Sequence, residues 1–157
     1  MNLADKIVEN SDVVIDGKAY KVLGKALYNT QDVPETTYYK ILFEDHFVLV
    51  IVPSEEITYF GKNMGLVKEF ETCPFESCPR TVKYLGKMYT QKTHDHQVLL
   101  ELLFGSQHEV EGNVEFWDYE TIENDIISLA IDKCTSKRAD VVGRYISLDE
   151  IEVFNGK

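Results

Sequence analysis

The segment Lys21-Val22-Leu23-Gly24-Lys25 returns later in the chain as Lys83-Tyr84-Leu85-Gly86-Lys87. Each copy precedes a run with the composition of a β-strand, residues 38–44 in the first case and 97–104 in the second. A repeat of this kind gives information about the architecture of a protein rather than about its chemistry. The repeated segment predicts two related β units that are fused or packed face to face.

Alternating apolar residues and turn signals predict an antiparallel all-β fold. Asp16-Gly17 is a dipeptide that favours a tight type I′ hairpin turn. We expect further turns at Glu44-Asp45, at Thr93-His94-Asp95-His96 and at Ile122-Glu123-Asn124, each between two strand-like runs. Short strands separated by such signals are typical of barrels and sandwiches. We therefore predict two related small barrel-like or half-barrel units packed together, with a short N-terminal helix.

The same pattern divides the chain into four parts. We expect an N-terminal helix over residues 1–11, a first β unit over 12–65, a linker over 66–80 and a second β unit over 81–157. Because a unit of roughly 60 residues buries little surface alone, the two units should form one compact body. The run Phe47–Val52 is apolar on both faces, which predicts a central strand or one beneath an interface.

Composition and charge exclude several classes of protein. A chain of 157 residues with 44% hydrophobic and 27% charged residues is too apolar for global disorder. Its net charge of -11 argues against nucleic-acid binding and against docking on anionic membranes. The N-terminal residues lack a signal-peptide pattern, and the longest apolar run is too short for membrane insertion. Three cysteines without a secretory context predict reduced thiols and a cytoplasmic location.

Two cysteines and two histidines form the one candidate metal site. Cys73 and Cys78 have C-x4-C spacing, and His94 and His96 follow. Zinc accepts two Cys and two His ligands, although structural His ligands usually stand three to five residues apart. The alternative, which we favour, is a loop with two incidental cysteines and a polar turn. A disulfide between Cys73 and Cys78 is geometrically possible, but we do not expect one in a reducing compartment.

Sequence signatures of catalysis are otherwise missing. The chain has no G-x-S-x-G motif and no glycine-rich phosphate loop, so we expect no cofactor. Its four histidines, His46, His94, His96 and His108, fall at predicted turns or loops, where solvated imidazoles are usual. We therefore expect a protein that is not an enzyme.

The stretch Phe116-Trp117-Asp118-Tyr119-Glu120 is the most distinctive of the chain. Trp117 and Tyr119 share one face of a predicted strand, where they could stack a ligand or anchor a partner. The other interpretation, which we favour, places the single Trp in the core.

Three short motifs stand in order along the chain: the hairpin and strand from Asp16 to Gly24, Trp117-Asp118-Tyr119-Glu120, and a glycine-led closing hairpin at 142–146 with 151–153. Together they resemble the motifs of a bacterial family, domain of unknown function 4178. The chain has Tyr38-Tyr39 where that family often has Trp. The family carries no assigned activity, and its members resemble accessory proteins found with phage-shock-type membrane-stress components and polyamine enzymes.

These observations predict a non-enzymatic binding or adaptor module. Its partner would be a protein or a small ligand, and the candidate binding residues are Trp117, Tyr119, Tyr38 and Tyr39. The alternatives are a zinc-binding protein or metal-dependent enzyme using the Cys/His cluster, and a purely structural or assembly subunit.

Overall fold

The structure is a computed structural model, and it describes residues 3–30, 36–53, 57–71, 78–105, 114–132 and 135–155. Side chains are described throughout these ranges except at residues 93–100. The described part begins with a short helix and continues almost entirely in strands. The elements are α1 (Leu3–Lys6), β1 (Ser11–Ile15), β2 (Lys18–Thr30), β3 (Thr37–Phe43), the 3-10 helix η1 (Glu44–His46), β4 (Phe47–Val52), β5 (Ile57–Gly65), η3 (Lys68–Phe70), β6 (Thr81–Tyr84), β7 (Lys87–Gly105), β8 (Val114–Glu120), β9 (Asp125–Asp132), β10 (Asp140–Tyr145), η5 (Leu148–Glu150) and β11 (Ile151–Asn155).

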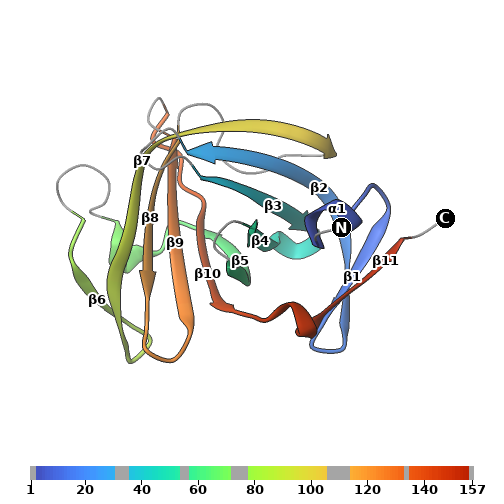
Figure 1. Ribbon diagram of the computed structural model, residues 1–157. Helices are drawn as coiled ribbons and strands as arrows, with labels where there is room; N and C mark the ends of the chain where they lie inside the picture. The colour runs from blue at the N-terminus through green and yellow to red at the C-terminus, as the bar shows by residue number, and fades with distance from the viewer. Residues whose placement is uncertain are drawn as a thin grey trace.

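The strands form one antiparallel sheet in the order β11-β1-β2-β3-β4-β5-β10-β9-β8-β7-β6. The long strand β7 also pairs with β2, since its residues 90–98 lie opposite β8 and its residues 98–105 lie opposite β2. Figure 1 shows β7 rising beside β8 and then bending over to run along β2. The sheet is therefore strongly curved, and its two halves face each other.

The prediction of an antiparallel all-β fold with a short N-terminal helix is confirmed. The finer prediction, two barrel-like units packed together, does not match this sheet. Strands from before and after the expected linker pair directly, β5 with β10 and β2 with β7. Backbone hydrogen bonds thus join the two halves into one sheet.

The repeated segment is not a structural repeat. In the first copy Gly24 lies inside β2, opposite Leu42 of β3 and Gly105 of β7. In the second copy Leu85 and Gly86 form the turn between β6 and β7, with φ angles of 48° and 80°. The same residue types thus lie inside a strand in the first copy and in a left-handed turn in the second. The strand pairings around each copy determine its backbone conformation.

The predicted turns have different outcomes. Asp16 and Gly17 both have positive φ, 54° and 76°, as a type I′ turn requires, and they join β1 to β2. The turn predicted at Thr93–His96 is wrong, since β7 runs through these residues. The pairing of β7 with β8 shifts register on both sides of them. A bulged strand can accommodate the polar stretch that, in the sequence, resembles a turn.

Three clusters of buried side chains follow from the curvature. The first fills the space between the two halves and takes residues from β2–β5 and from β8–β10. The second lies on the other face of β2–β5, beneath α1, β1 and β11. The third covers the other face of β8 and β9 with Val67, Phe70 and Tyr89. Residues of β4 point alternately into the first and second clusters, which confirms that Phe47–Val52 is a central strand with two buried faces.

A close approach of two backbones fixes the pairing of β5 with β10, and one lysine holds the N-terminal helix on the sheet. A Cβ atom on Gly143 would lie 2.2 Å from the carbonyl oxygen of Phe60, so β5 and β10 can approach this closely only with glycine there. The buried ammonium of Lys25 donates hydrogen bonds to the carbonyl oxygens of Ala4 at 2.5 Å and Ile7 at 3.1 Å, which fastens α1 to β2. No helix among the described residues is long and apolar enough to cross a membrane.

Candidate functional site

The four aromatic residues predicted to bind a partner do not share one surface. Trp117 is 2% exposed and Tyr119 is fully buried, both in the third cluster. Tyr38 stacks on Tyr28 in the first cluster, with ring centroids 5.0 Å apart. Tyr39 packs on the second cluster, beneath the ammonium of Lys25. Trp117 is therefore a core residue, as the interpretation that we favour predicts.

Tyr119 has a structural contact of its own. Its hydroxyl donates a hydrogen bond to the carbonyl oxygen of Pro79, and its ring lies 4.7 Å from the ring of Phe70. Burial raises the pKa of the Tyr119 phenol above its ordinary value. Tyr119 therefore holds the segment before β6 against β8.

The Cys/His cluster lies mostly outside the residues that can be described. This applies to Cys73 and to the side chains of His94 and His96. Cys78 is disulfide-bonded, whereas the sequence predicts reduced thiols. A disulfide depends on two Cα atoms lying within about 7 Å, a property of the fold that a count of cysteines does not reveal. Within the described residues, no group of three or more His, Cys, Asp or Glu could hold a metal ion.

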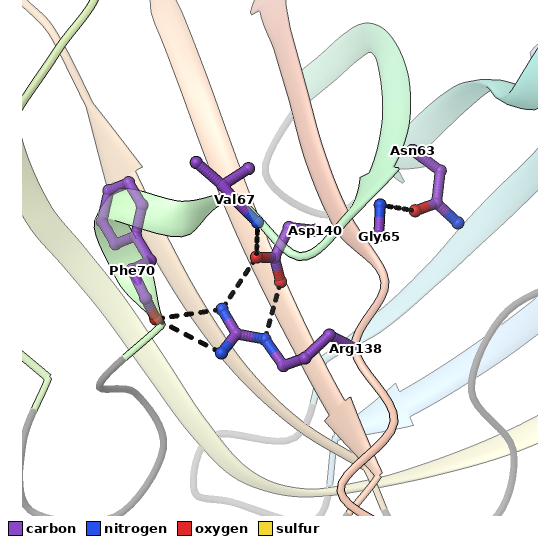
Figure 2. Close-up of polar contacts among 6 residues, drawn as sticks. All are labelled: Asn63, Gly65, Val67, Phe70, Arg138 and Asp140. Atoms are coloured by element: carbon purple, nitrogen blue, oxygen red, sulfur yellow. Dashed lines mark hydrogen bonds and ion pairs between the residues drawn. The ribbon is translucent and has the colours of Figure 1, made fainter.

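A buried ion pair fastens the segment between β5 and β6. Figure 2 shows Arg138 and Asp140 joined side by side, with Nε and Nη2 of the guanidinium 2.9 and 2.7 Å from the two carboxylate oxygens. Arg138 also donates to the carbonyl oxygen of Phe70, and the Asp140 carboxylate accepts from the Val67 N–H at 2.8 Å. Asp140 is fully buried. Burial raises the pKa of the Asp140 carboxyl, against the opposing effect of the Arg138 bonds.

Every polar atom of this pair drawn in Figure 2 is directed at another protein atom. The pair therefore has a structural role: it holds Val67 and Phe70 on the third cluster. The sequence does not reveal it, because Arg138 and Asp140 stand in a stretch that reads as a charged, solvated turn.

A second polar group lies on the inner face of the sheet near its edge. The Tyr145 hydroxyl donates to Glu120 at 2.9 Å, and the Lys92 ammonium lies 3.4 Å from that hydroxyl and 3.6 Å from the same carboxylate. The three groups satisfy one another. This arrangement is typical of a partly exposed structural network.

Aromatic rings and lysines gather on the outer face of β2, β4 and β5. Tyr20, Phe47 and Phe60 are partly buried there, and their ring centroids lie 5.0–5.5 Å apart. The exposed ammonium groups of Lys18 and Lys62 lie 5.8 and 5.4 Å from the centre of the Phe47 ring. We call these five residues the aromatic–lysine patch.

The lysines of this patch have no carboxylate partner in the part of the chain that the structure describes. Among the described residues, neither Lys18 nor Lys62 forms an ion pair. The neighbouring Arg144, which lies opposite Phe60 in the pairing of β10 with β5, differs because Asp16 and Glu150 both bind it. On a protein of net charge -11, these two lysines, which are unpaired with respect to the described residues, are unusual beside partly exposed rings.

A small pocket adjoins the patch at the turn between β3 and β4. Its volume is about 180 Å³, and its walls are mainly apolar, with Asp45, His46 and Asn63 at the polar positions. The apolar lining comes from Leu23, Leu42, Phe43, Phe47 and Val48. Asp45 and His46 both have positive φ, 60° and 67°, a conformation that non-glycine residues adopt rarely and that often accompanies functional sites. Phe47 belongs both to this turn pocket and to the patch.

The sequence gives little sign of this site. Its side chains come from the four strands β2 to β5 and from the turn between β3 and β4, and each aromatic residue alone resembles a core position. The available signal is the pair of aromatic residues flanking the β3–β4 turn, Phe43 and Phe47, together with Lys18 just after the first hairpin turn.

Comparison of the chain with family models, with curated proteins and with solved structures finds no match. The resemblance to domain of unknown function 4178 therefore stays a prediction from short motifs.

Proposed function

We propose that this protein is a non-enzymatic binding or adaptor module that contacts its partner through the aromatic–lysine patch and the turn pocket. The observation that carries the proposal is a pair of lysines, Lys18 and Lys62, that form no ion pair with any described residue and lie beside partly exposed aromatic rings. Aromatic side chains surrounded by polar and charged groups are a frequent composition of protein interfaces.

The rigidity of the support strengthens this proposal. Phe47 and Phe60 stack with ring planes 7° apart, and both rings rest on the second buried cluster. The patch therefore offers a preformed surface, which lowers the entropy lost on binding. An accessory role in a membrane-stress or polyamine-related system, which the family resemblance implies, is compatible with such a surface and forms part of the proposal.

Photo-crosslinking in cells of the source organism tests the proposal directly. A photoreactive amino acid is placed at position 62 in one variant and at position 83 in a matched control. Lys83 is also an exposed lysine, but it lies on β6, at the opposite end of the sheet order from β1 and β2. We expect a discrete adduct from position 62 that the control lacks. Equal adducts from both positions, or none from position 62, would contradict the proposal.

A further inference from the structure

We propose that the turn pocket and the aromatic–lysine patch together recognise an acidic polypeptide segment that inserts one apolar side chain. This inference rests on the proposed binding function and adds the chemistry of the partner.

The size of the turn pocket indicates a single side chain as the anchor. A dry cavity of about 150 Å³ accommodates benzene, and the turn pocket measures about 180 Å³. Pockets for drug-sized ligands are larger, about 300–1,000 Å³. The walls contributed by Leu23, Leu42 and Val48 favour a phenyl or branched aliphatic group.

The lysines define the charge of the residues beside that anchor. Because Phe47 lines the pocket and also lies beneath Lys18 and Lys62, a chain with its anchor in the pocket passes within reach of both ammonium groups. Carboxylates on that chain would give the lysines the ion-pair partners that they lack among the described residues.

The acidic character of the whole protein does not oppose this choice. At physiological ionic strength the Debye length is about 8 Å, so exposed charges further away are largely screened and the contacting lysines dominate. Asp45 at the turn is the nearby exception, since it also lines the pocket. It should direct the carboxylates of the segment away from the turn and toward the lysines.

Three fluorescein-labelled ten-residue peptides test the inference by fluorescence anisotropy. The first is acidic with one central phenylalanine, the second replaces that phenylalanine with serine, and the third replaces the acidic residues with lysines. We expect the first peptide to bind at least about tenfold more tightly than the second, since loss of an anchor in an apolar pocket has effects of this size. We also expect it to bind more tightly than the third.

Charge variants locate the binding. Lys18→Glu and Lys62→Glu should each weaken binding of the first peptide at least about threefold, in the upper range for exposed charge pairs. Lys83→Glu is the matched control and should leave the affinity unchanged, whereas Asp45→Asn should strengthen it. All four positions are exposed, so the variants should remain folded, which thermal unfolding checks.

Several outcomes would overturn the inference. These are equal binding of the acidic and basic peptides, equal binding with and without the phenylalanine, an effect of Lys83→Glu as large as that of Lys62→Glu, and no binding of the acidic peptide. If one of them occurs while the crosslink at position 62 persists, the partner class is wrong and the binding surface stands. If the crosslink is absent as well, both proposals fail.

Discussion

Replacing Arg138 with methionine tests the buried ion pair. The substitution keeps most of the side-chain volume but leaves the fully buried Asp140 carboxylate with the Val67 N–H and without its guanidinium partner. Removing one member of a buried pair destabilises a protein by about 3–5 kcal/mol. A domain of this size has a free energy of unfolding of about 5–15 kcal/mol, so Arg138→Met should remove a large fraction of it.

The loss should depend on pH in a direction set by Asp140. Burial already raises the pKa of this carboxyl in the folded protein, and removal of Arg138 should raise it further. The folded state then binds a proton that the unfolded state releases, so stability falls as the pH rises from the unfolded pKa through the folded one. Arg138→Met should therefore be more destabilising at pH 8 than at pH 5.

A double variant separates the charge from the packing. In Arg138→Met/Asp140→Asn no buried charge remains, and the amide oxygen can still accept from the Val67 N–H. The Phe70 carbonyl loses its donor, which costs about 1–3 kcal/mol. The double variant should therefore be more stable than Arg138→Met alone at pH 8.

Urea unfolding followed by the fluorescence of Trp117, the single Trp of the chain, provides the measurement. Trp117 lies in the same buried cluster as Phe70 and so reports on this region. The reasoning is refuted if Arg138→Met loses less than about 1 kcal/mol at pH 8, or if the double variant is no more stable than the single one.

Three other substitutions test the fold. Trp117→Ala should lower the free energy of unfolding by about 3–5 kcal/mol, and a loss below about 1 kcal/mol in urea unfolding followed by circular dichroism would contradict its burial. Gly143→Ala should cost about 1–3 kcal/mol, because its Cβ would lie 2.2 Å from the Phe60 carbonyl oxygen; an unchanged melting temperature would show that the strands can part freely. Lys25→Met should change global stability by only about 1 kcal/mol, because removing a buried charge offsets the lost hydrogen bonds. Hydrogen exchange should nevertheless become faster at residues 3–10, and unchanged exchange there would contradict the fastening of α1.

Local turn signals predict the antiparallel fold well and the pairing of distant strands poorly. Asp16-Gly17 indicates a hairpin through two neighbouring residues, and the apolar run at Phe47–Val52 indicates a strand buried on both faces. The pairing of β2 with β7 depends on residues about 75 positions apart, such as Ala26 and Leu102, for which no local pattern exists. The repeat that contains Gly24 and Gly86 predicts similar local structures, which the two copies do not have. Their conformations follow from their pairing partners rather than from their neighbours in sequence.

As with the fold, only part of the candidate site could be predicted from the sequence. Trp117 and Tyr119 attract attention as a motif, yet they are core residues because the segment around Phe70 covers them. Phe47 and Phe60 appear unremarkable in the sequence, but the pairing of β4 with β5 and the approach of the β1–β2 hairpin place lysines beside them.

The pairing of β1 with β11 has a consequence for how the chain folds during synthesis. Ser11–Ile15 lies opposite Ile151–Asn155, so one side of β1 stays unpaired until the ribosome has released nearly the whole described chain. Contacts of such long sequence separation form slowly, because the entropy of closing the loop is lost before the contact is gained. In the interval β1 presents an open edge to other nascent chains. We therefore expect aggregation during expression to depend on the speed with which β11 is synthesised and pairs with β1.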